Sequence, residues 1–402
     1  IRPRDWSSDV CSPDLPSHVP PPQRLPRPRP PLPLTGVLSR RCPAGRGSLP
    51  GHARTEGLGK TDGMAALNIP STHRQVLIDS LPEGRLAASN FAVSTGPVPS
   101  PGDGEVLCRT LAITIGAGQR AGLQGSASYA GAPEAGRVMG GTGIAEVVVG
   151  AGSLKPGDLI WVQTGWQEYS VQRAAGVRAI DPTVSPADHL GLLGLNGLTA
   201  YFGVVEVGRV QAGETFLVSA AAGSVGHIAG QVAKALGARV VGIAGSDEKA
   251  AMLVNDLGFD VGLNRKSSSF RDEFRAATPK RVDVYFDNTG GELLEAALFR
   301  MNRGGRIACC GAASQYDTST PGPGPRGVPG LLINNRVRME GFLIFDYEDR
   351  YDEARAQLLA WKREGRVRPL VSTYHGLESA PQAFVELLNG VTSGTTVVEL
   401  DR

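Results

Sequence analysis

A run of small residues, Val218-Ser-Ala-Ala-Ala-Gly-Ser-Val-Gly226, is the most informative stretch of this sequence. The apolar run Thr215-Phe-Leu-Val218 leads into it, and the helical pattern Ile228-Ala-Gly-Gln-Val-Ala-Lys-Ala-Leu236 follows it. A buried strand, a tight turn and a helix are the setting in which the pattern Ala-x-Gly-x-x-Gly binds the pyrophosphate of a dinucleotide. The stretch therefore predicts a strand-turn-helix unit with a dinucleotide-binding turn.

Ala221, Gly223 and Gly226 occupy the three small positions of this pattern. Small residues there permit the turn, let the backbone approach the phosphates and allow the helix to pack closely on its strand. The diphosphate can then sit on the N–H groups at the amino end of the helix. Because an ordinary strand-turn-helix can carry the same pattern, the flanking sequence has to separate the two interpretations.

The segment after the helix favours NADPH over NADH. Ala238-Arg-Val-Val-Gly-Ile243 predicts a second strand, and Gly245 follows it where an NAD-binding site normally has an Asp or Glu for the ribose 2′-hydroxyl. Ser246 and Lys249 are placed to meet a 2′-phosphate instead, and Arg265 at the end of a third strand adds a second cation. The alternative is that Lys249 and Arg265 are ordinary solvated charges.

Length and composition allow two domains and exclude several classes of protein. The chain has 402 residues, of which 41% are hydrophobic and 20% charged, so it can bury a sizeable core. Its formal net charge of +2 gives no reason to expect nucleic acid or an anionic membrane as a partner. The sequence has no apolar run of the roughly 18 to 20 residues that a membrane helix needs, and no secretory h-region, so we expect a cytoplasmic protein.

The cysteines predict neither a metal site nor a disulfide framework. They show no Cys-x-x-Cys pair and no nearby histidine spacing. Cys309 and Cys310 lie in an apolar run, and we expect them to be inert core thiols. The five cysteines are at positions 11, 42, 108, 309 and 310.

Residues 1–63 differ from the rest of the chain. They contain 13 of its 29 prolines, many arginines and little periodic apolar sequence, so we expect them to be disordered. A transit peptide is disfavoured because Pro20-Pro-Pro22 would break an amphipathic helix. Residues 4–15 look like a translated sequencing adapter, which makes Met64 the expected start of the native protein.

The order of predicted elements indicates an α/β protein with two sheets. Short β runs separated by Gly and Pro clusters predict a small barrel-like domain, and from about Leu195 strands alternate with helices, which predicts a doubly wound parallel sheet. The predicted strands of the first part are 75–78, 91–93, 104–109, 112–115, 143–149, 159–162 and 167–171. Those of the second part include 215–218, 238–243, 282–286 and 306–310.

In these motifs and in the order of its elements, the chain resembles the medium-chain dehydrogenase/reductase superfamily. Within it, the sequence is similar to the zinc-independent leukotriene B4 dehydrogenase, prostaglandin reductase and curcumin reductase family, over about residues 72 to 402. The segments that carry the resemblance are Gln163–Tyr169, Leu195–Gly203, Ala212–Glu214, Ser219–Gly226, Val241–Lys249, Val284–Gly291, Cys310–Tyr316 and Gly341–Tyr347.

The resemblance implies a GroES-like β-barrel catalytic domain and a Rossmann cofactor domain, with the active-site cleft between them. We expect a leader at 1–63, the catalytic domain at 64–194, the NADP-binding domain at 195–372 and a return to the catalytic domain at 373–402. Members of the family are often dimers, so a homodimer is expected as well.

The family reaction is reduction of the carbon-carbon double bond of an α,β-unsaturated ketone or aldehyde by NADPH. Hydride adds to the β-carbon, the α-carbon takes a proton, and the developing enolate oxygen needs hydrogen-bond donors but no metal. The resemblance assigns this donor to Tyr316, for which a packed loop tyrosine is the alternative, and places Asn288 along the nicotinamide. The implied cofactor-binding residues are Ala221, Gly223, Ser224, Val225, Gly226, Gly245, Ser246, Lys249, Arg265, Asn288, Gly311 and Phe345.

The sequence departs from the family pattern at three places. Gly118 stands where relatives have a substrate-side tyrosine in the segment Thr114–Arg120, which bears on the substrate class. Arg265 replaces a tyrosine beside the adenosine phosphate. Thr392 and Thr395 replace an asparagine and a lysine, which predicts the loss of an amide contact at the cofactor end of the cleft.

Two alternatives to an enone reductase stay open. A quinone reductase of the same superfamily needs the same cofactor, a cleft and an electron-poor conjugated acceptor. A non-catalytic NADPH-binding scaffold or redox sensor would explain the changes at Gly118, Thr392 and Thr395. NADPH consumption that depends on a substrate separates an enzyme from a scaffold, and product analysis separates the two enzymes.

Overall fold

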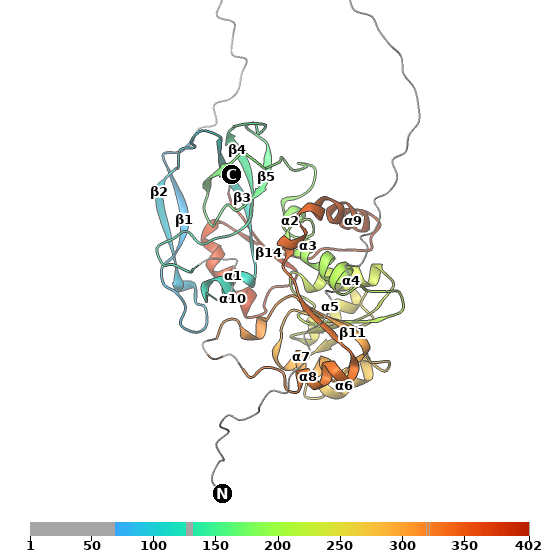
Figure 1. Cartoon of the computed structure of the whole chain (residues 1–402). Coiled ribbons are helices and arrows are strands. Elements are labelled where there is room, and N and C mark those ends of the chain that lie inside the picture. The colour runs from blue at the N-terminus through green and yellow to red at the C-terminus, as the bar shows by residue number, and fades with distance from the viewer. Residues whose placement is uncertain (1–68, 126–131, 319, 321, 402) are drawn as a thin grey trace, which may run out of the picture. The chain divides into compact units, whose positions relative to one another are not determined.

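A computed structural model of the chain describes residues 69–125, 132–318, 320 and 322–401. Contacts divide the chain into Ile1–Met64 and Ala65–Arg402. The predictions made for the leader lie outside the described residues. The remainder is a mixed α/β unit built on two six-stranded sheets and one strand pair (Figure 1).

The predicted doubly wound parallel sheet is confirmed. Its neighbouring strands are all parallel, and their order is β12-β11-β10-β7-β8-β9. Numbered along this half of the chain, the order is 3-2-1-4-5-6, which places a topological switch point between β7 and β10, where α/β proteins bind ligands. The strands are β7 (Thr215–Val218), β8 (Arg239–Ala244), β9 (Val261–Asn264), β10 (Val282–Asp287), β11 (Met301–Cys309) and β12 (Arg338–Gly341).

Helices cover both faces of this sheet. Successive strand residues point to opposite faces, and both sets are apolar, so each face has to be buried. Phe216 and Phe286 belong to one buried cluster, whereas Leu217 and Tyr285 belong to another. Helices α3, α4 and α9 contribute to the first cluster, and α6 and α7 contribute to the second. The helices are α3 (Leu195–Phe202, continued by a π-helical turn at 203–207), α4 (Gly226–Ala235), α5 (Asp247–Asn255), α6 (Phe270–Ala277), α7 (Gly291–Leu298), α8 (Val328–Asn335) and α9 (Tyr351–Arg363).

The second sheet joins strands from both ends of the described chain (Figure 1). Its order is β13-β14-β3-β4-β5, and β6 also pairs with β3. Strands β1 and β2 form a separate antiparallel pair. The strands are β1 (Thr72–Ile78), β2 (Phe91–Pro97), β3 (Glu105–Ile115), β4 (Gly143–Val149), β5 (Leu159–Val162), β6 (Tyr169–Arg173), β13 (Val371–His375) and β14 (Thr395–Glu399). The associated helices are α1 (Gly118–Leu123), α2 (Pro186–Leu190) and α10 (Ala380–Leu388).

Several predicted strand boundaries differ from the structure, and the largest differences are in β3 and β11. The runs 104–109 and 112–115 form one strand, β3, which changes partner along its length: residues 105–109 pair with β6 and residues 112–115 with β14. Strand β11 begins at Met301 rather than at Arg306. The sequence pattern missed its first half because residues 302–305 are polar or glycine, and the pairing with β10 is irregular there.

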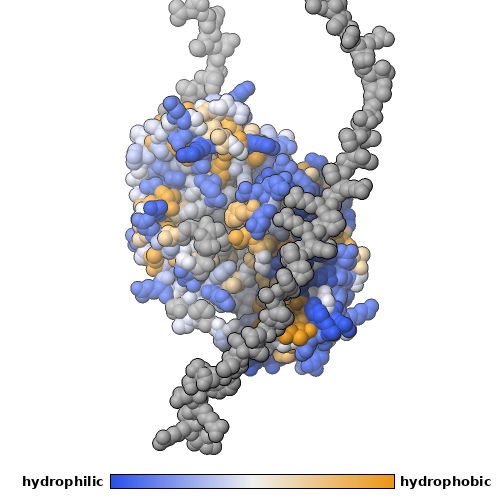
Figure 2. Space-filling view, viewed as in Figure 1, coloured by the Kyte–Doolittle hydropathy of each residue, from blue (hydrophilic) through white to orange (hydrophobic). Residues whose placement is uncertain are grey.

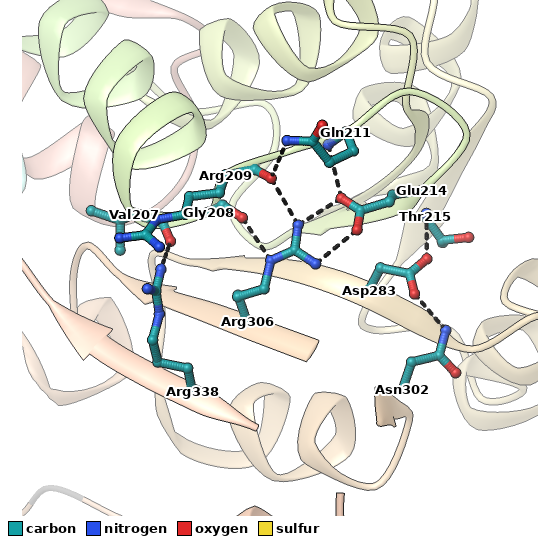
Figure 3. A network of polar contacts seen from close by, with 10 residues as sticks. All are labelled: Val207, Gly208, Arg209, Gln211, Glu214, Thr215, Asp283, Asn302, Arg306 and Arg338. Carbon is teal, nitrogen blue, oxygen red and sulfur yellow. Dashed lines mark hydrogen bonds and ion pairs between the residues drawn. The ribbon is translucent and has the colours of Figure 1, made fainter. Parts of the chain in front are cut away.

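A polar network lies at the amino-terminal ends of the strands of the parallel sheet (Figure 3). The guanidinium of Arg306 donates to the carbonyl of Gly208 at 2.9 Å and forms an ion pair with Glu214 at 2.6 Å. Asp283 accepts a 2.8 Å hydrogen bond from the backbone N–H of Thr215, where β7 begins. Since Val218–Gly226 lies at the opposite end of β7, this network is remote from the predicted cofactor turn.

The described cysteines are free thiols. Cys108 is buried, and burial raises its pKa to about 12. Cys309 and Cys310 are half-buried rather than fully buried, yet desolvation and the nearby Asp287 carboxylate still raise their pKa values, to about 11 and about 12. Such thiols carry little thiolate near neutral pH.

None of the helices in the described ranges combines the length and apolar character needed to cross a membrane. The face seen in Figure 2 carries hydrophilic residues over most of its visible area, with smaller apolar areas between them. Isolated apolar side chains on a surface are ordinary in globular proteins.

Candidate cofactor and active site

The glycine-rich turn lies at the switch point, between the end of β7 and the start of α4. A Cβ at Gly226 would lie 2.3 Å from the carbonyl oxygen of Ala220, and one at Gly223 would lie 3.2 Å from the same atom. Ala221 is fully buried, and no side chain caps the amino end of α4. A side chain at Gly226 would therefore clash, one at Gly223 would be tightly placed, and the turn offers a helix terminus to an anion.

Asn288 lies across the switch point from this turn. Its Nδ2 donates to the carbonyl of Ser219 at 2.8 Å, and its backbone N–H donates to Ser219 Oγ at 3.0 Å. The preceding Asp287 is buried and accepts a 2.7 Å hydrogen bond from the hydroxyl of Tyr285. Burial and that carboxylate raise the pKa of Tyr285 well above its ordinary value, so Tyr285 acts here as a fixed hydroxyl donor. The ends of β7 and β10 are thus tied together beside the predicted cofactor turn.

The predicted 2′-phosphate site has free space at Gly245 and carries both cations and the carboxylates of Asp247 and Glu248. A Cβ at Gly245 would meet no atom within 4 Å. Ser246 caps α5 by accepting from the backbone N–H of Lys249 at 3.3 Å. Burial, and the charge of Lys266 as a smaller cause, lower the pKa of Lys249. Arg265 is exposed, as is Lys266 beside it.

Lys266 is a cation that the motif comparison missed, although its place beside Arg265 was visible in the sequence. It lies close enough to Lys249 to affect the pKa of that amine. Of the two cations that were predicted, Lys249 is half-buried and hydrogen-bonded, which does not fit a solvated charge, whereas Arg265 is exposed.

The segment before β14 contacts both the glycine-rich turn and α5 through its backbone. Lys249 Nζ donates to the carbonyls of Gly390 and Thr392, at 2.7 and 2.6 Å. Ser224 Oγ donates to the carbonyl of Gly394 at 3.0 Å. Thr392 therefore contributes a carbonyl to this site whatever its side chain is. Thr395 is buried and accepts from Asn196 Nδ2 at 3.4 Å.

Tyr316 follows a single 3-10 turn, Ala313–Gln315, after β11. Its hydroxyl accepts a 3.3 Å hydrogen bond from the backbone N–H of Ala312, which leaves the hydroxyl proton available for another acceptor. The backbone N–H of Ala313 donates to the carbonyl of Asn288 at 3.1 Å. The backbone N–H of Gly311 donates to the carbonyl of Asp287, also at 3.1 Å. The structure thus brings the tyrosine loop, Gly311 and Asn288 together.

The remaining predicted residues lie in other segments. Val225 precedes the first residue of α4, and Gly118 is the first residue of α1. Phe345 lies in the 3-10 segment Ile344–Arg350 and is 45% exposed. The described residues do not bring together three or more His, Cys, Asp or Glu side chains that could hold a metal ion.

Comparisons with known proteins show the family to which the chain belongs. Residues 224–361 match the sequence model of a family described as zinc-binding dehydrogenase, and residues 74–180 match one described as N-terminal domain of oxidoreductase. The NADPH-dependent curcumin reductase of Escherichia coli is 34% identical over 334 residues, which are 82% of this chain and 97% of that protein. The NADP(+)-dependent 2-alkenal reductase of Nicotiana tabacum is 36% identical over 341 residues, which are 82% of this chain and 98% of that protein.

A solved structure extends the comparison to three dimensions. The crystal structure of CurA from Vibrio vulnificus in complex with NADPH is 33% identical to this chain, with a TM-score of 0.78. The match covers 82% of this chain and 99% of CurA.

Proposed function

Since this chain belongs to the medium-chain dehydrogenase/reductase superfamily, among the prostaglandin and curcumin reductases, we propose that it reduces the carbon-carbon double bond of α,β-unsaturated ketones or aldehydes with NADPH. The observation that carries this proposal is the placement of the Tyr316 loop against Asn288, at the switch point that also holds the glycine-rich turn. A cofactor turn and a hydroxyl donor are the two parts that this reaction needs from the protein.

The residues around the turn fit NADPH. Ala221, Gly223 and Gly226 leave room for a diphosphate at the amino end of α4, and Gly245 leaves open space where an NAD enzyme has its acid. Ser246, Lys249, Arg265 and Lys266 would hold the 2′-phosphate. We extend the cofactor site to Ser224 and Val225 in the turn, to Asn288 and Gly311 beside it, and to Phe345.

The chemistry asks little else of the protein. When bound, NADPH supplies a hydride to the β-carbon of the conjugated carbonyl. The substrate carbonyl oxygen then gains negative charge, and the Tyr316 hydroxyl would donate to it. The α-carbon takes its proton from solvent or from a group that solvent reprotonates. Positioning and one donor suffice because the conjugated β-carbon is already electrophilic, so zinc independence is part of the proposal.

The domain division is proposed on the same basis. Residues 64–194 and 373–402 form the catalytic domain, and residues 195–372 form the cofactor domain. Strand β13 begins at Val371, two residues before the predicted return. We also propose a cytoplasmic location and a homodimer. Exposed Ile333 and Leu343, on either side of the edge strand β12, support the dimer.

The test is a screen of NADPH oxidation over enones, enals and quinones, with identification of the product. We expect saturated ketones or aldehydes from enones and enals. Consumption with quinones alone would favour the quinone reductase. Tight NADPH binding without consumption on any acceptor would favour the scaffold, and either result would reject the proposal.

A further inference from the structure

We propose that an ion pair between the buried Arg120 and the partly buried Asp317 positions Tyr316 for turnover by attaching its loop to helix α1. This rests on the proposed function, because the Tyr316 hydroxyl is proposed to donate to the substrate oxygen during the reduction. Arg120 and Asp317 are positioning residues, since they would act through Tyr316 rather than on the substrate.

Arg120 lies in helix α1, which follows strand β3 of the second sheet. Its side chain is only 1% exposed, and Asp317 is 18% exposed. Arg120 Nε lies 3.1 Å from Asp317 Oδ1, and its Nη2 donates to the carbonyl of Gly84 at 2.6 Å. An arginine in this position presents a rigid set of donors, so it can fix both a carboxylate and a carbonyl in direction as well as in distance.

The residues directly after Tyr316 carry the second half of the attachment. Asp317 Oδ1 also accepts from the backbone N–H of Leu86 at 2.5 Å. The carbonyl of Thr318 accepts from Gln124 Nε2 at 3.3 Å. Asp317 has a φ of 57°, in the left-handed region, where non-glycine residues are uncommon and often occur at functional sites.

The residues before Tyr316 are attached to the parallel sheet instead. Ser314 Oγ donates to the carbonyl of Thr289 at 2.6 Å, and the backbone N–H of Ser314 donates to the same carbonyl at 3.0 Å. Tyr316 therefore lies between an anchor on the cofactor side, made through Thr289, and an anchor on the α1 side, made through Arg120. A change in the second anchor would turn the hydroxyl relative to the predicted nicotinamide position.

Stability alone is a weak reason for such a pair. Burying two charges costs solvation free energy, and an apolar pair of similar volume is often as stable. A buried pair does, however, select one geometry over its alternatives. Within the motif segment Thr114–Arg120, the last residue, Arg120, reaches the Tyr316 loop through Asp317.

The experiment is a double-mutant cycle on turnover. We expect Asp317→Asn to lower kcat for an enone about tenfold with little change in the KM for NADPH, and Arg120→Lys, which keeps the charge, to lower it less. In a Tyr316→Phe background the Asp317→Asn substitution should cause no further loss. If the fold losses in kcat of Asp317→Asn and Tyr316→Phe multiply fully in the double variant, the two residues act independently and the proposal is overturned. A Tyr316→Phe variant with unchanged turnover would overturn it as well.

A matched control is Glu214→Gln in the Arg306–Glu214 ion pair, at the opposite edge of the parallel sheet, where the side chains are 19% and 22% exposed. This variant should keep its turnover. A similar kcat loss in it would point to a general effect of breaking an ion pair and would overturn the proposal.

Amide hydrogen exchange separates this inference from the proposed function, because it needs no substrate. Asp317→Asn should speed exchange in residues 312–318, whereas Glu214→Gln should not. If the unmutated protein reduces no enone, the proposed function fails, and the exchange result still decides whether the pair anchors the loop. Unchanged exchange in 312–318 would reject the anchor.

Discussion

At the scale of single residues, Lys249 determines the expected preference between cofactors. Its Nζ donates to two backbone carbonyls, and a Cβ at Gly245, four positions earlier in the chain, would meet no atom within 4 Å. We expect Lys249→Ala to weaken NADPH binding by about 1.5 to 3 kcal/mol, or roughly tenfold to a hundredfold, because a charge-assisted contact to phosphate is lost. NADH binding should hardly change. Titration of both cofactors measures this, and equal affinities in the unmutated protein would contradict it.

Tyr316 is the second test at this scale. If its hydroxyl donates as charge develops on the substrate oxygen, Tyr316→Phe should lower kcat by roughly ten- to a thousandfold with little change in NADPH affinity. A tyrosine that is merely packed would lose about 1 kcal/mol of stability and no turnover. Steady-state kinetics on a good enone, together with thermal unfolding, distinguishes the two roles.

Residue identities could be predicted where the chemistry is local. The spacing of Ala221, Gly223 and Gly226 fixes a turn within a few residues, and the clashes at Ala220 explain why small residues stand there. The partner of Arg120 could not be found in this way, because Asp317 is 197 positions away along the chain. Nor do side-chain patterns reveal that Thr392 contributes its carbonyl.

At the scale of elements, α4 carries a buried histidine that links the cofactor turn to the strand beyond it. His227 Nδ1 lies 2.8 Å from the carbonyl of Gly223, and Nε2 accepts from the backbone N–H of Leu370 at 3.1 Å. Burial lowers the pKa of His227 to about 4, against about 6.5 in the unfolded chain. The unfolded state therefore binds the proton more readily, and the contribution of His227 to stability falls as the pH drops from 6.5 towards 4.

This linkage amounts to a loss of up to about 3 kcal/mol over that interval. Urea unfolding at pH 7, 5.5 and 4.5 measures it. Because carboxylates also contribute to acid destabilisation, the comparison is with His227→Gln, which cannot titrate and should lose less stability over the same range. Parallel curves for the two proteins would refute the assignment.

Elements were predictable where hydrophobic periodicity is clear. Strands β7, β8 and β10 have largely apolar sequences because both of their faces are buried, as Leu217 and Phe216 illustrate. The prediction divided strand β3 into two strands. In the structure it is one strand whose partner changes between Arg109 and Ala112, and the sequence of a strand does not reveal which strands it pairs with.

At the scale of the whole molecule, Gly394 lies where the two sheets are joined. Its backbone N–H donates to the carbonyl of Ala222 at 2.8 Å, its φ is 69°, and a Cβ would lie 2.1 Å from the carbonyl of Leu370. We expect Gly394→Ala to lower both the free energy of unfolding and NADPH affinity. Gly390→Ala is the matched control, since Gly390 has a φ of 70° but open space around its Cα, so it should lose only about 1 kcal/mol. Equal losses of stability in the two variants would contradict the steric explanation.

The interior position of β14 also has a consequence for synthesis. The six strands of the parallel sheet come from one continuous stretch, 215–341, so all of them have left the ribosome while the last part of the chain is still being made. Strand β3, by contrast, waits until residues 395–399 emerge before its 112–115 edge is paired. During translation that edge is open to pairing with other nascent strands. On a crowded polysome we therefore expect aggregation through the amino-terminal half of this protein more than through the parallel sheet.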